Sequence, residues 1–197
     1  MVKSRNASFC GVPLVPLLRS PQYRALPSLS STSYLRHDAL VLSTIIEPAG
    51  GLPVVAAMSA LSTAGAAEET RLAAQDRATA VMVPVNDGVP ERFAEHLATI
   101  ARVSALGIVL NDHPAATGIS IAPPALIAAM HDLGVVVVVK AEAPPTSPGI
   151  AMISGAADVP MFGGLGGVSL LDELLVRSAG AMAGFAVAEV LVATVEA

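Results

Sequence analysis

The sequence predicts an α/β fold in which about six βα units build part of a (β/α)8 barrel. The chain has 197 residues, 53% of them hydrophobic, which is enough for a sizeable core in one domain. Its apolar runs are short and end at glycine, proline or a charged residue, as the buried strands of a parallel sheet do. These runs alternate with helical patterns at a steady interval, which is typical of repeated βα units.

The predicted strands follow one another at intervals of 22 to 28 positions. They are expected to begin near Leu52, Thr79, Leu106, Gly134, Asp158 and Gly180. The fourth of them, GVVVVVK, is the most apolar strand and ends at Lys140.

Helical patterns separate the strands. They lie in TAGAAEETRLAAQDRA, PERFAEHLATIARV, APPALIAAMHDLG, a weaker stretch at Gly149 to Ile153, and VSLLDELLVRSAG. The segment PERFAEHLATIARV shows the pattern best, because Pro90 stands at its start and Phe93, Leu97 and Ile100 share one face.

Six βα units fit either an open doubly wound sheet or part of a (β/α)8 barrel. A doubly wound nucleotide-binding sheet is expected to carry a glycine fingerprint after its first strand, whereas VVAAMSALSTAG contains neither GxGxxG nor a phosphate-loop pattern. The later GGLGG segment lacks a following Lys-Ser/Thr pair and is interpreted as a strand-to-helix turn. The barrel is therefore favoured, although it is two units short of eight.

Residues 1–37 differ from the rest of the chain. They contain no Asp or Glu and include the serine-rich tract SLSSTSYLR, as an organellar transit peptide would. Four prolines interrupt the segment and no amphipathic helix is evident, so a poorly ordered leader is the alternative. The predicted organisation is a basic leader over 1–37 and an incomplete barrel domain over 38–197, which opens with a helix in DALVLSTIIEPAGG and closes with one in AVAEVLVATVEA.

Composition and charge exclude several classes of protein. A net charge of −5 without basic clusters argues against nucleic-acid binding, and no stretch of about 18 residues is apolar enough to suggest a membrane span. The single cysteine excludes an internal disulfide and a cysteine-based zinc site. The four histidines are not at metal-ligand spacing, and His96 and His131 are expected on helix surfaces. No metal and no organic cofactor is predicted. A cytoplasmic location is expected, or an organellar one if the leader is a transit peptide.

Polar residues follow the predicted strands at the end where a barrel carries its chemistry. They are Ser59, Asn86, Asp87, Asn111, Asp112, His113, Lys140, Glu142 and the glycines of GGLGG. Lys140 comes directly after five valines, and the chain has one other lysine, Lys3. Burial among valines disfavours the charged form of a lysine, so the free amine would be available to attack a carbonyl and form a Schiff base. The alternative is a lysine that leaves its strand and extends into solvent.

Three segments resemble a known family. GIVLNDHPAATGISI, then VVVVVKAEA, then MFGGLGGVSLLDELLVRSAGAMAGF are similar to the second half of the dihydrodipicolinate synthase and N-acetylneuraminate lyase family of class I aldolases. The resemblance runs from about Asp38 to the C-terminus. It implies a (β/α)8 barrel, usually tetrameric, of which the six strands here would be the third to the eighth.

The resemblance also implies roles for particular residues. Lys140 matches the lysine that forms an imine with pyruvate or another 2-oxo acid. Gly164 matches a glycine near that acid, and Met182 matches an apolar residue that packs on its carbon skeleton. Thr117 belongs to the turn after the family's fifth strand, and Ala116 stands where the synthases often have a carboxylate-binding arginine.

Two departures from the family matter. The tyrosine that shuttles protons in the family falls at Asn111, and an amide cannot exchange a proton near neutral pH. Asp112 or His113 could supply an acid or base there, or could simply be polar loop residues. The family's first two strands, with the motif that grips the 2-oxo acid carboxylate, have no counterpart in residues 1–37.

The prediction is a lyase or aldolase-type enzyme that acts on a pyruvate-like 2-oxo acid through a Schiff base on Lys140. Asn111 and His113 are the other candidate catalytic residues, and Gly164, Met182 and Thr117 are expected to contact the substrate. The alternative is a catalytically inactive barrel fragment or pseudoenzyme with an association role, and a truncated gene model would also explain the missing strands. Association into a homo-oligomer is expected from the resemblance.

Overall fold

The computed structural model describes residues 52–184 apart from Asp132, residues 188–196, and seven positions nearer the N-terminus. Those seven are Ser8, Phe9, Val12, Pro13, Leu42, Ile46 and Ala49. The predicted leader over 1–37 and the predicted helix after Asp38 therefore lie outside the described residues, except at these positions. Strands β1 (Ser8–Phe9) and β2 (Val12–Pro13) pair with each other in antiparallel fashion and form a sheet of their own.

The main sheet has six parallel strands that pair in chain order, β3 to β8. They are β3 (Val55–Ala57), β4 (Ala80–Pro84), β5 (Gly107–Asp112), β6 (Val136–Ala141), β7 (Met161–Gly163) and β8 (Gly180–Ala181). All six predicted strands are confirmed, with their predicted order and direction.

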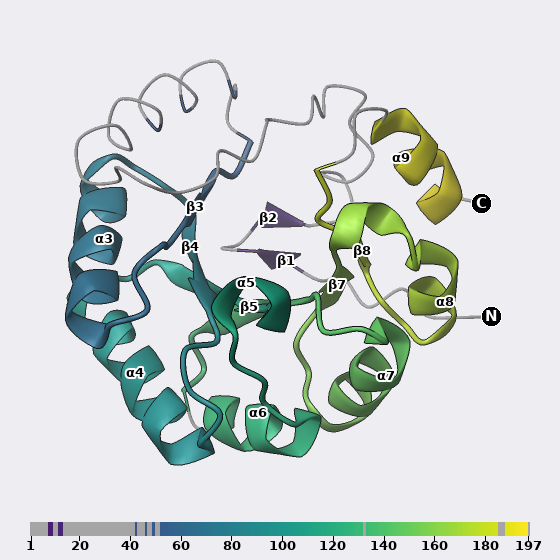
Figure 1. Ribbon diagram of the computed structural model, residues 1–197. Helices are drawn as coiled ribbons and strands as arrows, with labels where there is room; N and C mark the ends of the chain where they lie inside the picture. The colour runs from purple at the N-terminus through teal and green to yellow at the C-terminus, as the bar shows by residue number, and fades with distance from the viewer. Residues whose placement is uncertain are drawn as a thin grey trace.

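The longer helices lie along the outer side of the curved sheet, whereas the four-residue helix after β5 is drawn in front of that strand (Figure 1). These elements follow the strands in chain order. They are α3 (Thr63–Gln75), α4 (Pro90–Val103), α5 (Pro114–Thr117), α6 (Pro123–Met130), α7 (Thr146–Ala156), the 3-10 turn η1 (Leu165–Gly167), α8 (Leu170–Leu175) and α9 (Ala188–Glu196). A sheet that curves with every covering helix on one side is part of a barrel, whereas a doubly wound sheet carries helices on both faces. The partial (β/α)8 barrel is therefore confirmed.

Three elements differ in extent from the predictions. Helix α7 is longer than the weak stretch at Gly149 to Ile153, because it begins at Thr146 and the proline at position 148 falls in its first turn, where proline is tolerated. Helix α8 is shorter than VSLLDELLVRSAG, because Val168 is the C-cap of η1, Ser169 is the N-cap of α8, and Arg177 adopts a positive φ of 75° just after the helix ends. The short helix α5 was not predicted.

Apolar side chains pack on both faces of the sheet. The larger cluster lies between the sheet and the helices and includes Val83, Leu110 and Met161 with Phe93 and Leu126. The smaller cluster lies on the inner side of the curve. Its buried members are Ala80, Val109, Val138 and Phe162, with Met82 and Met182 partly buried against them. Side chains alternate between the two faces along each strand, so the inner row of each strand leads to its C-terminal end and to the residues there. No helix among the described residues is long and apolar enough to cross a membrane.

Candidate active site

Lys140 lies near the C-terminal end of β6, between two neighbouring strands. It is in register with Asn111 of β5 and with Phe162 of β7. Val109 and Val138 belong to the inner cluster, so Asn111 and Lys140, each two residues further on, point to the same inner side. The Lys140 side chain is 15% exposed. The alternative of a lysine that extends into solvent is therefore wrong.

Glu142 is the charged partner of Lys140. Its Oε2 lies 2.7 Å from Lys140 Nζ, and its side chain is 8% exposed. The other oxygen, Oε1, accepts a hydrogen bond of 3.0 Å from the backbone N–H of Leu165, in the loop after β7. Glu142 N–H in turn donates to the carbonyl of Asp112 at 2.8 Å. Sequence reasoning placed Glu142 at this end of the sheet but gave it no role; its spacing of two from Lys140 on an extended chain was the signal that the two share a face.

His113 lies near the same carboxylate oxygen. Its Nδ1 is 3.5 Å from Glu142 Oε2, and its side chain is 29% exposed. One carboxylate oxygen is thus near both the amine of Lys140 and the imidazole of His113. The three side chains could exchange protons at this point, since each is an acid or base within a short distance of the next.

Asp112 lies next to this group and is partly buried. Its Oδ1 is buried and has no hydrogen-bond partner among the described residues. Burial raises the pKa of Asp112 to about 6, and the nearby His113 partly opposes that rise. The carboxyl group therefore changes its protonation state close to neutral pH.

Asn111 occupies the position beside Lys140 on the adjacent strand. Its Oδ1 is also buried without a hydrogen-bond partner among the described residues. The side chain can donate and accept hydrogen bonds but cannot carry a proton between groups near neutral pH. Asn111 can therefore orient a bound molecule, and acid–base chemistry falls to its neighbours.

Gly164 and Met182 complete the inner side of the site. A Cβ atom at Gly164 would overlap the Glu142 side chain, so a larger residue there would displace the carboxylate. Met182 packs against the inner cluster that contains Phe162, and its N–H donates to the carbonyl of Gly163 at 2.8 Å. Both residues lie at the end of the barrel that carries Lys140, which agrees with where the sequence placed them.

The Thr117 hydroxyl makes its hydrogen bonds within its own turn. Thr117 is the last residue of α5, and its hydroxyl contacts the carbonyls of Ile119 and His113 at 3.3 and 3.4 Å, while Ile119 N–H lies 3.2 Å from it. No contact with Lys140 or Glu142 accompanies these. A role in substrate binding stays a prediction for this residue.

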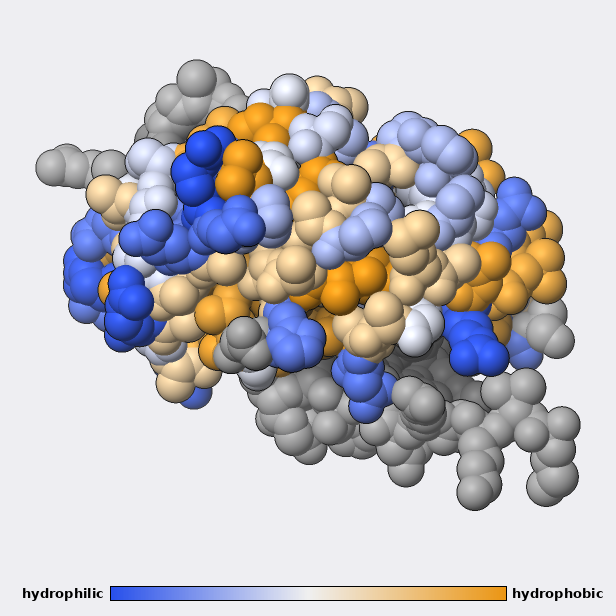
Figure 2. Space-filling view, turned by 90° about the horizontal axis from the view of Figure 1, so that it is seen from below, coloured by the Kyte–Doolittle hydropathy of each residue, from blue (hydrophilic) through white to orange (hydrophobic). Residues whose placement is uncertain are grey.

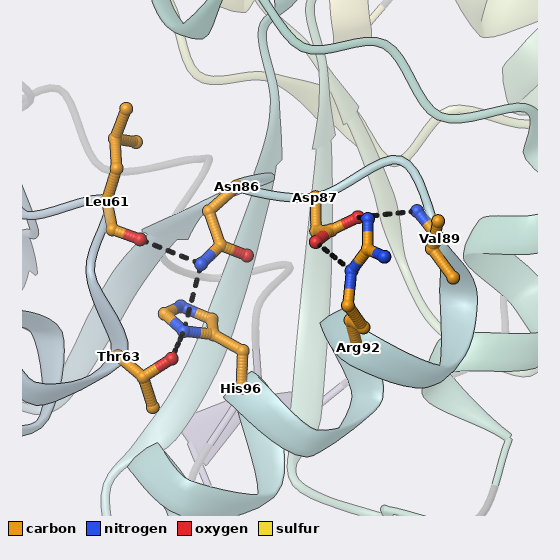
Figure 3. Close-up of polar contacts among 7 residues, drawn as sticks. All are labelled: Leu61, Thr63, Asn86, Asp87, Val89, Arg92 and His96. Carbon is orange, nitrogen blue, oxygen red and sulfur yellow. Dashed lines mark hydrogen bonds and ion pairs between the residues drawn. The ribbon is translucent and has the colours of Figure 1, made fainter.

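A second polar group lies between α3 and α4, at the end of β4 (Figure 3). The Asn86 amide donates to the carbonyl of Leu61 at 2.8 Å and faces His96 Nδ1 at 3.0 Å, with Thr63 Oγ1 2.9 Å from the same nitrogen. Asn86 and Thr63 thus both place a polar group against the same ring nitrogen of His96. Nearby, Asp87 accepts two hydrogen bonds from Arg92.

His96 corrects one prediction. It was expected on the surface of its helix, but it is 2% exposed, because the loops after β3 and β4 close over that face of α4. Burial lowers the pKa of His96. A cavity of about 410 Å³ adjoins this group and is lined by Thr63, Asn86, Asp87, Arg92, Glu95, His96 and Thr99. Lys140 is not among the lining residues.

Comparison with known proteins shows which proteins this chain is similar to. Over 104 residues, 49% of this chain, the sequence is 35% identical to a 4-hydroxy-tetrahydrodipicolinate synthase of Thermomicrobium roseum. The fold matches the dihydrodipicolinate synthase of Rhodopseudomonas palustris with a TM-score of 0.73 at 22% identity, covering 81% of this chain. These matches show a divergent and partial likeness to the dihydrodipicolinate synthases. The resemblance seen in the sequence is thereby confirmed.

The likeness to dihydrodipicolinate synthases covers most of this chain but less of its relatives. The chain spans 32% of the Thermomicrobium protein and 56% of the Rhodopseudomonas one. The enzyme of Thermotoga maritima matches with a TM-score of 0.73 at 21% identity over 94% of this chain and 69% of its own. Another solved relative, 24% identical, is described as the first monomeric dihydrodipicolinate synthase variant. No protein-family model matches the chain.

Proposed function

We propose that the chain carries the nucleophile of an aldolase-type lyase that acts on a pyruvate-like 2-oxo acid through a Schiff base on Lys140. Kinship with dihydrodipicolinate synthases supports an aldolase-type lyase at the level of the family. One observation carries the proposal to this chain: the amine of Lys140 is shielded from solvent on the inner side of the barrel, 2.7 Å from the Glu142 carboxylate.

Glu142 is placed to carry the proton that imine formation needs. The lysine starts as an ammonium ion, and its proton passes to the Glu142 carboxylate. The free amine then attacks the C2 carbonyl of the 2-oxo acid, and the carbonyl oxygen takes a proton from the attacking nitrogen. Protonated Glu142 returns its proton to the hydroxyl, which leaves as water, and the iminium ion remains. The ammonium and the ketone thus give an iminium and one water, with no other reactant.

The remaining site residues have supporting roles in this proposal. Asn111 orients the bound acid through its amide, and His113 contacts the same Glu142 oxygen that Lys140 does. Gly164 leaves room for the Glu142 carboxylate, and Met182 offers an apolar surface to the carbon skeleton. Thr117 keeps its predicted place in the turn after β5. A cytoplasmic location and self-association belong to the same proposal, and the bacterial relative gives the organellar alternative no support.

Borohydride trapping tests the proposal. Pyruvate and sodium borohydride are expected to add mass to the peptide that carries Lys140, and Lys140→Ala should abolish the adduct, as should Lys140→Arg, which keeps the charge. Glu142→Gln should slow trapping by about 10²-fold, because the proton carrier is lost. A folded protein that forms no adduct with pyruvate or longer 2-oxo acids would contradict the proposal.

The second candidate is a catalytically inactive barrel fragment or pseudoenzyme with an association role. Asn111 favours it, because no tyrosine stands at that position to move protons. An untrapped Lys140 in a folded, self-associating protein is the result this candidate predicts.

A further inference from the structure

Glu173 is a buried acidic residue that the proposed reaction does not use. It lies on α8 and is 1% exposed. Thr146, the first residue of α7, donates a hydrogen bond of 2.6 Å to Glu173 Oε1. Glu173 Oε2 is buried without a hydrogen-bond partner among the described residues. Burying a carboxylate costs free energy unless its oxygens are hydrogen-bonded. A buried carboxylate with one unpaired oxygen is therefore expected to serve the structure or the site in some way.

The unpaired oxygen of Glu173 lies against the end of β7. A Cβ atom at Gly163 would overlap the Glu173 carboxylate, just as one at Gly164 would overlap the Glu142 carboxylate. Successive residues of an extended chain point to opposite sides. The Gly163–Gly164 backbone is therefore held between two buried carboxylates, with Glu142 on the side of Lys140 and Glu173 on the side of the helices.

This stretch of backbone also fixes Glu142 directly. Leu165 N–H donates to Glu142 Oε1 at 3.0 Å, and Gly164 forms the surface against which the carboxylate packs. A displacement of residues 163–165 would move both the donor and that surface. Glu142 would then be free to leave its position 2.7 Å from the Lys140 amine.

We propose that Glu173, held by Thr146, is a positioning residue that fixes the backbone of residues 163–165 and through it the orientation of Glu142 toward Lys140. The inference rests on the proposed function in taking Lys140 as the reacting amine. A residue that acts in this way changes Lys140 only while Glu142 is present.

A double-mutant cycle on the full chain tests this dependence. The first readout is the rate at which acetic anhydride acetylates Lys140 at pH 8, which needs no 2-oxo acid. Glu142→Gln is expected to raise that rate, because the carboxylate that binds the amine is removed. Glu173→Ala should raise it several-fold in the wild-type background and leave it unchanged in the Glu142→Gln background. Borohydride trapping with pyruvate, the second readout, should fall several-fold with Glu173→Ala and fall no further in the Glu142→Gln background.

Conservative variants separate positioning from general loss of structure. Glu173→Gln keeps the size of the side chain and the acceptor for Thr146, so it should behave like the wild type. Thr146→Ser keeps the hydroxyl and should also behave like the wild type. Thr146→Val removes the hydroxyl and should resemble Glu173→Ala. If Glu173→Ala does not fold, Thr146→Val replaces it in the double-mutant cycle. Asp172→Asn removes an exposed charge from the same helix and should change neither readout.

Equal effects of Glu173→Ala in the two backgrounds would overturn the inference, since they would show a structural role alone. Coupled acetylation rates in a protein that pyruvate does not trap would leave the positioning role standing and remove the proposed function. Trapping of pyruvate together with uncoupled acetylation rates would leave the proposed function standing and remove the positioning role of Glu173.

Discussion

At the scale of single residues, Lys140 is the centre of the candidate site, and its Nζ lies 2.7 Å from Glu142 Oε2. Its pairing with Glu142 depends on how the β7 loop holds the carboxylate, through Leu165 N–H and Gly164, more than twenty residues further along the chain. Side-chain contacts across strands are set by register and loop shape, which periodicity does not specify.

Asp112 gives a prediction at this scale. Its pKa is raised from 3.8 to about 6 in the folded protein, so the folded state binds a proton more readily than the unfolded one. The stability that this proton binding contributes is fully present below about pH 3.8 and is lost as the pH rises through about 6. Above that, an ionised carboxylate is held partly out of water at a cost in stability.

Asp112→Asn removes this cost. The variant is expected to be more stable than the wild type at pH 8, on the order of 1 kcal/mol because the group is only partly buried. The difference should shrink at pH 4, where the wild-type carboxyl is protonated. Denaturant unfolding of both proteins at the two pH values measures it, and a difference independent of pH would show that the Asp112 charge is not its source.

At the scale of elements, strands were easier to predict than helices. Each strand is a short apolar run buried on both faces, and such a run can be recognised in the sequence without knowing which strands lie beside it. Lys140 could be found in this way, because it follows five valines near the end of such a run. Helices α6 and α7 contain no charged residue, so their periodicity is weak and three prolines near the start of α7 hid its first turn. The burial of His96 could not be read from α4, because loops after β3 and β4 supply the partners that make a buried histidine acceptable.

The link between those loops and α4 yields the second prediction. Asn86→Ala would leave the Leu61 carbonyl without its donor and remove one of the two polar contacts of His96 Nδ1, so a loss of about 1 to 3 kcal/mol in the free energy of unfolding is expected. Thr99→Ala is the matched control, because Thr99 lines the same cavity but its hydroxyl donates only to its own helix, at Glu95. Amide exchange at the start of α3 and in α4 should quicken in Asn86→Ala. A stability loss no larger than that of Thr99→Ala would contradict the prediction.

At the scale of the whole molecule, the outer surface is unevenly polar. Viewed from below, apolar residues gather over the middle of the surface and hydrophilic ones at the side of α3 and α4 (Figure 2). The charged residues of α4 and their absence from α6 and α7 account for this division. Further along the chain, Val168, Leu171 and Leu175 are 81%, 67% and 84% exposed. Large apolar side chains so fully in water mark a surface that another molecule covers.

A second copy of the chain is the partner we expect on the α8 surface. The three exposed residues recur at spacings of three and four, so they form one stripe on and before the helix. A self-complementary contact about a twofold axis would cover the stripe on both copies at once, which makes a homodimer the simplest assembly that removes it from water.

Sedimentation velocity should therefore show the wild type larger than a monomer. Leu171→Glu combined with Leu175→Glu should give a monomer that still folds, since both side chains point away from the core. Val103→Glu, at an exposed apolar position at the end of α4, is the control and should keep the wild-type mass. If the double variant sediments like the wild type, association either does not occur or uses another surface, and the exposed leucines of α8 then have no role in it.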